Sequence, residues 1–386
     1  MTAPAEPESS PPRGVRFRRS ANLFAYWTRS GLTVRNFLTG SESVLSQQAT
    51  EILGELAQWR SPDDLARDRG ADVGSTWATL SELLRCDAIE AFNVPPDDAE
   101  VAMRDWRFWC PEAAIFHFGT KDVVYSQERP SRGGVVDYPV ELPAATKSYP
   151  DADKVQLPPY SQTGELAETL LARRTWRRFG PEPITKQDLA TLLGLTWGVQ
   201  HWADFGPARS PLKTSPSGGA RHSIEAYVVA LRVDGLEPGT YYYDPDGHQL
   251  AALSAGASGD LVDEFLPQIP SYRGAAALVF MTSLFERVWW RYRFPRAYRT
   301  ILLEAGHLCQ TMCLVATRLG LAPFCTAAIA DSKVERHLGV DGVGESVIYL
   351  AGVGARPPDE SEWAPAANPD ATPAVHPPKH ARRKSP

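Results

Sequence analysis

From residue 160 onward, the hydrophobic pattern switches repeatedly between a helical and a strand period. Apolar residues at helical spacing predict three helices, at 163–174, 185–199 and 297–319. Apolar runs rich in β-branched and aromatic residues predict four strands, at 225–233, 240–243, 275–283 and 345–352. Thr185 and Asp188 form a capping-box pattern, and D-P-D-G-H after Tyr243 predicts a hairpin turn. We therefore expect an α+β domain over residues 160–356.

Residues 15–97 carry a shorter pattern, typical of a small separate unit. Loose alternation predicts two short strands, at 16–27 and 33–38, around a turn at Ser30-Gly31. Three helices and a last strand are expected next, at 43–58, 61–69, 75–86 and 89–92. Ser61 and Pro62 give the second helix a clear start. This order suggests a winged-helix-like domain. Its predicted recognition helix has one arginine, which favours a peptide or protein partner over DNA.

The remaining segments are a connector and two tails. Residues 98–159 are rich in aromatic residues and proline, and we expect W-R-F-W-C-P-E-A-A-I-F-H-F to pack over a domain seam. His117 in that segment is weak evidence for chemistry. Residues 1–14 and the proline-rich, basic 357–386 are expected to be disordered tails. The basic end could touch an acidic partner, but a solvated tail is favoured.

Composition excludes several classes of protein. The 386 residues include 40 Lys and Arg against 46 Asp and Glu, a formal charge of −6, which leaves no basic footprint for nucleic acid. Five cysteines without C-x-x-C spacing indicate reduced thiols and a cytoplasmic location. The start lacks a secretory signal pattern. The longest apolar run, 274–285, is far shorter than the roughly 20 residues that span a bilayer, so no membrane association is expected.

Two segments carry candidate chemistry for binding an anion or a flat ligand. R-R-T-W-R-R-F at 173–179 has four arginines in six residues, an anion clamp or else a solvated basic helix end. S-P-S-G-G-A-R-H-S-I-E at 215–225 leads directly into a strand, and its glycines allow close approach of a ligand to the backbone. The alternative is a plain loop. Neither a Walker nor a Rossmann loop is present.

Two further segments lie near the C-terminus. In the segment 291–310 and just after it, Glu304 and His307 are spaced i,i+3, and Cys309 and Cys313 are spaced i,i+4, so a metal site is conceivable. Apolar neighbours favour buried helix packing instead, and no metal is predicted. F-C-T-A-A-I-A-D at 324–331 would let backbone amides face a cofactor ring, or else forms a tight turn.

These four segments, in this order, resemble the nitroreductase-like flavoproteins over about 160–356, and specifically their SagB-type branch. That branch includes the thiazoline and oxazoline oxidases and the peptide-maturation dehydrogenases of ribosomal-peptide biosynthesis. The resemblance implies a nitroreductase-like FMN fold, with a mostly antiparallel central sheet flanked by helices. It also implies a homodimer with FMN at the interface and an N-terminal winged-helix-like domain.

The resemblance assigns roles residue by residue. The phosphate and ribityl clamp would be Arg173, Arg174, Thr175 and Arg177, with a weaker phosphate contact from Arg356. The loop that lies against the flavin from the partner subunit would be Ser215, Pro216, Ser217 and Gly218. Ala327 and Ala328 would lie beside the reactive edge of the ring, and Gln310 would be a polar helix position near the cofactor.

The sequence departs from the branch at the expected base. Azoline oxidases carry a Lys-Tyr pair where this chain has Arg291-Tyr292-Arg293. Arginine, with a pKa above about 12, is a poor general base. Tyr292 is therefore the candidate acid/base group, and Arg291 and Arg293 are candidates to bind a carbonyl or carboxylate.

We accordingly expect an FMN-dependent dehydrogenase or oxidase of a ribosomally synthesised peptide, in which hydride passes from a substrate carbon to flavin N5 and dioxygen reoxidises the flavin. The N-terminal domain would hold the leader peptide or a partner cyclase. Two alternatives stay open. One is an NAD(P)H-dependent reductase of nitro, quinone or enone compounds, and the other is a non-catalytic peptide-binding scaffold.

Overall fold

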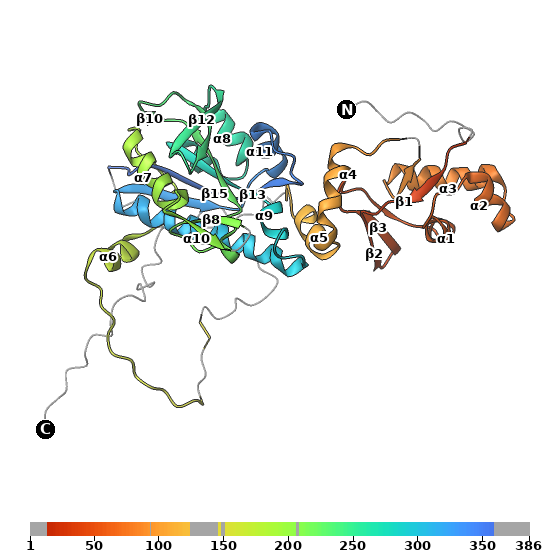
Figure 1. Ribbon diagram of the computed structural model, residues 1–386, viewed down its shortest axis with the longest axis horizontal. Coiled ribbons are helices and arrows are strands. Elements are labelled where there is room, and N and C mark those ends of the chain that lie inside the picture. Colours follow the sequence, from red (N-terminus) through yellow and green to blue (C-terminus); the bar gives the residue numbers. More distant parts are fainter. Residues whose placement is uncertain (1–13, 93, 124–145, 148–150, 206–207, 359–386) are drawn as a thin grey trace, which may run out of the picture.

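The computed structural model describes residues 14–92, 94–123, 146–147, 151–205 and 208–358 (Figure 1). The tails predicted at 1–14 and 357–386 lie almost entirely outside these residues, as does part of the predicted connector.

The N-terminal unit combines short strands with three helices. A three-stranded antiparallel sheet has the order β2 (Leu23–Thr28), β3 (Gly31–Asn36), β4 (Glu42–Val44), and β1 (Phe17–Arg19) pairs with β5 (Ile89–Ala91). The predicted turn at Ser30-Gly31 is confirmed, since Thr28 pairs with Gly31. The helices are α1 (Gln47–Glu55), α2 (Pro62–Arg69) and α3 (Val73–Arg85). The first helix starts later than predicted because 42–44 form β4, whereas Ser61 caps α2 as expected.

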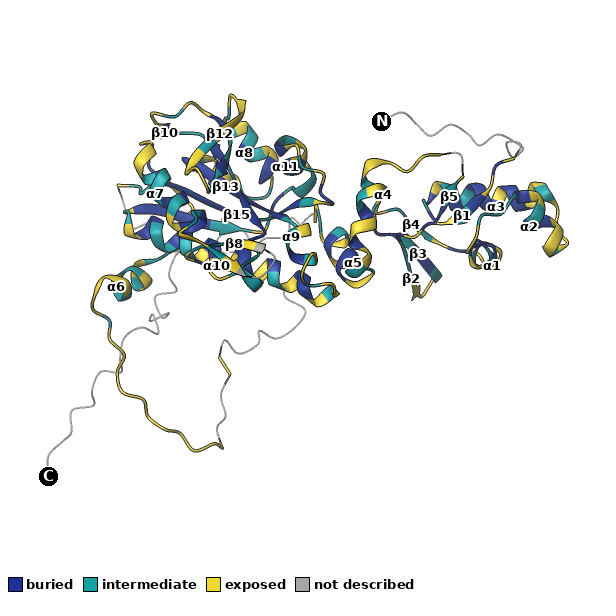
Figure 2. Ribbon diagram, in the orientation of Figure 1, coloured by how far each residue is buried: buried dark blue, intermediate teal, exposed yellow. Residues whose placement is uncertain are grey.

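A six-stranded sheet forms the centre of the C-terminal domain. Its order is β12 (Gln249–Ala255), β11 (Gly239–Asp244), β9 (Ile224–Ala230), β13 (Ala277–Leu284), β15 (Glu345–Ala355), β14 (Leu321–Thr326). Every neighbouring pair is antiparallel. The antiparallel sheet predicted from the sequence is confirmed, and Figure 2 shows its central strands β13 and β15 largely buried between the helices, whereas the edge strand β12 is mostly exposed.

Helices cover both faces of this sheet. The helices α7 (Lys186–Trp197) and α10 (Tyr298–Arg318) pack on one face, and α8 (Gly259–Phe265) and α11 (Asp331–Leu338) pack on the other. The capping box of α7 at Thr185 and Asp188 is confirmed. By length and composition alone, Pro295–Arg318 could cross a membrane, but half of its apolar window is buried within the protein. That burial is ordinary for the core helix of a sheet protein.

The remaining elements are short. They are α4 (Asp98–Ala102), η1 (Met103–Phe108), α5 (Glu112–Gly119), α6 (Glu165–Ala172), β6 (Ile184–Thr185), β7 (His201–Phe205), β8 (Ala208–Leu212), η2 (Gly218–Ala220), β10 (Val233–Asp234), η3 (Pro270–Gly274), α9 (Glu286–Trp289) and η4 (Pro295–Ala297). The β7–β8 hairpin was not predicted. The turn alternative for 324–331 is wrong in its first half, because residues 324–326 are the end of β14.

The aromatic connector packs against the C-terminal domain, as expected for a seam. Trp106 Nε1 donates to Val343 O at 2.9 Å, and Trp109 Nε1 donates to Tyr292 O at 3.0 Å. On the other side, Phe118 stacks on Phe37 of the N-terminal unit, with ring centroids 6.1 Å apart. The connector therefore joins the two units through one continuous apolar cluster.

Candidate functional site

The loop 215–219 runs antiparallel along α10. Its contacts follow the helix backwards: Ser215 Oγ to Thr311 Oγ1 at 2.7 Å, Pro216 O to His307 Nδ1 at 3.3 Å, and Ser217 Oγ to Glu304 Oε2 at 2.6 Å. One face of α10 thus supports the predicted flavin loop over about two turns. The helical spacing of apolar residues predicted that these residues lie on a helix, but it could not predict their contacts with the loop.

The carboxylate of Glu304 holds this loop on α10 through its hydrogen bond with Ser217. Its side chain is 3% exposed, and its carboxylate also accepts from Ile224 N at 3.3 Å. Burial raises the pKa of Glu304, and the Ser217 hydrogen bond opposes the rise. The side chains of Glu304 and His307 are both directed to the loop, so the metal site considered from the sequence for this pair does not form around them.

The backbone of the loop is strained. Gly219 has φ +61°, and the non-glycine residues Ala220 and His222 also have positive φ, at 53° and 43°. Glycine adopts positive φ without a steric penalty, but at Ala220 and His222 such a conformation costs about 1–3 kcal/mol and persists where the surroundings fix it. His222 N donates to Ser217 Oγ at 2.9 Å, which closes the loop on itself.

Tyr292 lies against the loop at Gly219. A Cβ on Gly219 would lie 2.6 Å from Tyr292 Oη and 3.2 Å from Cδ and Nε of Arg291. The predicted catalytic residues Tyr292 and Arg291 therefore border the loop. Arg293 points elsewhere, with its guanidinium 4.9 Å from the centroid of the Phe108 ring.

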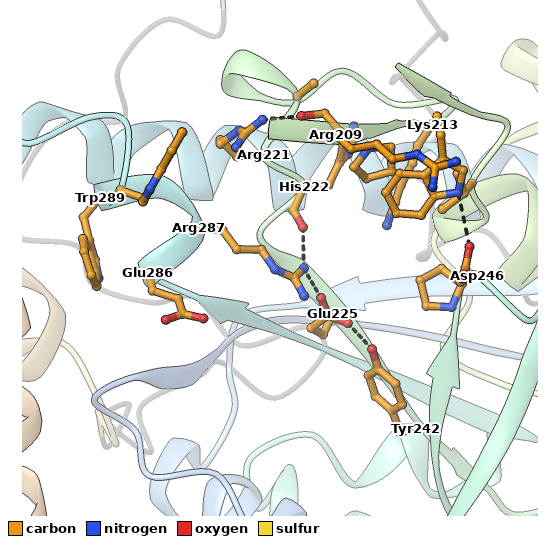
Figure 3. A pocket seen from close by; sticks show the side chains of 17 residues that line it. Arg209, Lys213, Arg221, His222, Glu225, Tyr242, Asp246, Glu286, Arg287 and Trp289 are labelled. Atoms are coloured by element: carbon orange, nitrogen blue, oxygen red, sulfur yellow. Dashed lines mark hydrogen bonds and ion pairs between the residues drawn. The ribbon is translucent and has the colours of Figure 1, made fainter. Parts of the chain in front are cut away.

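A pocket of about 510 Å³ opens beside the loop (Figure 3). Its lining includes four cations and three indole rings, namely Arg209, Lys213, Arg221, Arg287, Trp202, Trp289 and Trp290, together with the carboxylates of Glu225, Asp246 and Glu286. The Arg209 guanidinium lies 4.9 Å from the centroid of the Trp202 ring, and that of Arg221 lies 5.3 Å from Trp290. The pocket combines positive charge with flat apolar walls, which suits a ligand with both a carbonyl or carboxylate and a planar group.

A partly buried polar network forms the floor of the pocket. The Arg287 guanidinium is ion-paired with Glu225 and donates to His222 O at 2.8 Å. Tyr242 Oη donates to Glu225 Oε2 at 2.5 Å, and Figure 3 shows this chain of contacts. Burial lowers the pKa of His222 to about 4 and that of Lys213 below its usual range. Of these two groups, His222 is thus neutral at pH 7.

Sequence reasoning missed Trp202, Arg209 and Lys213. Trp202 and Arg209 sit on the unpredicted β7–β8 hairpin, and Lys213 follows it directly. A usable signal was present, because Lys213 and Arg221 flank the S-P-S-G-G loop in sequence.

The predicted phosphate clamp lies beside β14. Trp176 N donates to Pro323 O at 2.9 Å, which fixes 173–178 along that strand. The Arg356 guanidinium lies 5.6 Å from the centroid of the Trp176 ring and donates to Leu321 O at 3.2 Å. β14 leads directly into Ala327 and Ala328. The structure therefore brings together three of the sequence-predicted segments: the arginine segment, the two alanines and Arg356.

Not every predicted cofactor residue joins this group. Arg173 and Thr175 are half-buried, whereas Arg177 and Gln310 are exposed. The Arg174 guanidinium donates to Leu171 O at 2.5 Å, and the Ala328 amide donates to Thr326 Oγ1 at 3.0 Å. None of the clamp residues lines the pocket beside loop 215–219.

Comparison with known proteins gives one family match. The model described as "Nitroreductase family" matches residues 170–355. The protein "Putative nitroreductase MJ1384" of Methanocaldococcus jannaschii is 30% identical over 49% of this chain and 90% of its own length.

Two peptide-processing proteins are also similar. The trifolitoxin-processing protein TfxB of Rhizobium leguminosarum bv. trifolii is 38% identical over 35% of this chain and 38% of its own length. The microcin B17-processing protein McbC of Escherichia coli is 31% identical over 36% of this chain and 51% of its own length. This chain thus spans about half or less of these two relatives.

Two solved structures match about half of the chain. One is described as a putative nitroreductase from Anabaena variabilis, with 29% identity, a TM-score of 0.42, and coverage of 50% of this chain and 38% of that chain. The other is the E. coli microcin synthetase McbBCD complex with truncated pro-MccB17 bound, with 21% identity, a TM-score of 0.40, and coverage of 54% and 79%.

Proposed function

This chain belongs to the nitroreductase family, and from that premise we propose that it is an FMN-dependent dehydrogenase acting on a ribosomally synthesised peptide. The SagB-type resemblance is confirmed by the similarity to the trifolitoxin- and microcin-processing proteins. The observation that carries the proposal is the loop 215–219, held on α10 with Tyr292 Oη against Gly219 and a cationic, aromatic pocket alongside. Such a site can bind a peptide carbonyl beside a flat cofactor.

The donor groups fit FMN, which nitroreductases generally bind. Arginine forks suit a phosphate, and the clamp segment Arg173 to Arg177 is fixed beside the strand that ends at Ala327 and Ala328. When bound, FMN would supply the hydride acceptor at N5, and dioxygen would reoxidise the flavin. The chain supplies binding and orientation, with Arg356 as the weaker phosphate contact and Gln310 as a polar neighbour.

We further propose a homodimer. In this arrangement, as the family resemblance implies, the flavin held by the clamp of one subunit would lie against loop 215–218 of the other. Exposed leucines on α6 and α10 support such an interface, namely Leu166, Leu170, Leu302 and Leu303. Apolar side chains gathered on the surface commonly mark a protein interface.

The catalytic roles belong to this chain's own side chains. The Tyr292 hydroxyl would exchange a proton with the substrate, and Arg291 would hold its carbonyl. Trp109 fixes the Tyr292 backbone through its hydrogen bond to the Tyr292 carbonyl. Arg293, which lies on the Phe108 ring, is proposed to bind a substrate carboxylate after leaving that ring.

The N-terminal unit is proposed to hold the leader peptide or a partner cyclase. Within the described residues, β2 is an edge strand of its sheet, and Trp27 on it is 79% exposed. An edge strand can pair with an extended peptide, and an exposed indole adds apolar contact. The five free cysteines accord with a cytoplasmic location.

The first test is a visible spectrum of the purified full-length protein, followed by anaerobic addition of NADPH. The proposal expects a yellow protein that NADPH does not bleach and that peptide substrate does. Rapid bleaching by NADPH would favour the reductase alternative, and a protein that stays colourless after added FMN would favour the scaffold. Arg173→Ala should lose bound FMN, whereas Arg336→Ala on the exposed face of α11 should keep it.

A further inference from the structure

Three cysteines from α10 and β14 lie close together near Arg173 of the predicted phosphate clamp. Cys309 and Cys313 lie one turn apart on α10, and Cys325 lies on the neighbouring strand β14. Their three Sγ atoms are all within 4.8 Å of one another. Cys309 and Cys313 are buried, and Cys325 is partly exposed, which leaves one side from which an ion can enter. The sequence had favoured simple helix packing for the first two, because their neighbours along the helix are apolar.

The donor set selects a particular class of ion. Within the described residues, no histidine or carboxylate belongs to this group, so three sulfur ligands are offered. Structural Zn²⁺ sites nearly always have four ligands, whereas soft ions prefer thiolates. Three sulfur ligands in an apolar site therefore fit a soft ion of low coordination number better than Zn²⁺.

The charges near the cluster also fit. The positive charge of Arg173 acts on Cys313 and Cys325. When one Cu⁺ enters and two of the three thiols release their protons, two thiolates, one thiol and Cu⁺ carry a net charge of −1. The adjacent Arg173 balances that charge.

We propose that Cys309, Cys313 and Cys325 form a site for one Cu(I) ion, adjacent to the arginine clamp. This site is independent of the proposed peptide chemistry. Of the residues assigned to that chemistry, Arg173 alone contributes to the site, through its charge. The proposal rests on the three Sγ atoms from α10 and β14, which lie within 4.8 Å of one another.

The test is an anaerobic titration of the full-length protein with Cu(I) held by the chelator bicinchoninate. The protein should remove one equivalent of Cu(I) per chain. Cys325→Ser, at the partly exposed position, should weaken this by at least tenfold, while the Cys86→Ser/Cys110→Ser double variant should match the wild type. Failure to remove copper, equal binding by Cys325→Ser, or equally strong binding of Zn²⁺ would overturn the proposal.

A measurement that needs no variant complements the titration. X-ray absorption at the copper edge of the loaded protein should show three sulfur ligands. Nitrogen or oxygen ligands, or two sulfurs only, would assign the copper to another site. A Cys325→Ser variant that did not fold would leave this result decisive on its own.

Discussion

Ser217 Oγ donates a 2.6 Å hydrogen bond to Oε2 of Glu304, a residue 87 positions further along the chain. Ile224 N donates to the other carboxylate oxygen, so both oxygens of this buried group are used. A carboxylate can accept both bonds, whereas the amide of glutamine, which has the same size, presents its NH₂ donor to one of them. The position and shape of loop 215–219 therefore depend on this acidic group.

Glu304→Gln tests this dependence. With its Oε1 accepting from Ile224 N, the amide would present its NH₂ to Ser217, and the partly buried Ser217 hydroxyl would lose the acceptor of its proton, which costs about 1–3 kcal/mol. Both thermal stability and the FMN retained on purification should fall. Glu237→Gln, at an exposed position, is the matched control and should change neither. If Glu304→Gln keeps the wild-type melting temperature, the carboxylate does not hold the loop.

Gly219→Ala and Gly218→Ala form a matched pair within the loop. A Cβ added at Gly219 would lie 2.6 Å from Tyr292 Oη, and the backbone there has φ +61°. A Cβ added at Gly218 would lie 3.5 Å from Thr300 Cβ, an ordinary van der Waals contact. A left-handed backbone alone costs about 1–2 kcal/mol for alanine. We expect Gly219→Ala to lower the unfolding free energy by at least this amount, and Gly218→Ala by much less. Equal urea midpoints for the two would contradict the contact with Tyr292.

Tyr292→Phe removes the proposed acid/base hydroxyl and keeps the ring. Loss of general acid–base catalysis costs about 10²–10⁴-fold in rate. The rate at which the peptide substrate bleaches the flavin anaerobically should fall by that order, with FMN content unchanged. Tyr160→Phe, at an exposed position, should behave as wild type. Unchanged bleaching by Tyr292→Phe would remove this hydroxyl from the mechanism.

Local features of the fold could be predicted from the sequence. Ser61 and Thr185 each accept a hydrogen bond from the amide three residues later, an interaction contained within one turn. Buried strands such as β13 also stand out, because nearly every residue in them is apolar. These signals depend on neighbours in the sequence, which a single chain displays directly.

The site itself depends on contacts between distant segments. Ser217 and Glu304, or Cys313 and Cys325, are brought together only by the sheet and by the packing of α10. β14 escaped prediction because Pro323 interrupts its pattern. As an edge strand among those described, it tolerates a proline, whose carbonyl accepts from Trp176. Sequence motifs therefore identified the candidate residues, whereas the structure was needed to show how they are arranged.

The ion pair between Arg287 and Glu225 at the floor of the pocket is expected to contribute to stability. Arg287→Met leaves Glu225, whose side chain is 6% exposed, without its cation. Breaking a fully buried pair costs about 3–5 kcal/mol, and because the Arg287 side chain is 39% exposed we expect about 1–3 kcal/mol. The double variant Arg287→Met/Glu225→Gln should recover part of this loss in urea unfolding. Arg18→Met, which breaks a more exposed pair with Glu90, should cost less than about 1 kcal/mol.

His117 sets a pH dependence for stability. Its Nδ1 lies 2.8 Å from Tyr298 Oη and its Nε2 lies 3.1 Å from Gly342 O, so a neutral ring that donates from Nε2 satisfies both. Burial lowers the pKa of His117 to about 3, whereas the unfolded chain takes up the proton near its ordinary value of 6.5. The stabilisation is therefore complete above about pH 6.5 and is lost as the pH falls toward about 3.

His117→Phe measures this contribution. Between about pH 7.5 and pH 5, His117 alone should remove about 2 kcal/mol from the unfolding free energy of the wild type. His117→Phe should be less stable at neutral pH, since Gly342 O and Tyr298 Oη lose their partner, but its stability should fall less over this range, by about the same 2 kcal/mol. His201→Phe, at an exposed position, should keep the wild-type pH dependence. Parallel pH profiles for wild type and His117→Phe would show that this ring does not stay neutral in the folded protein.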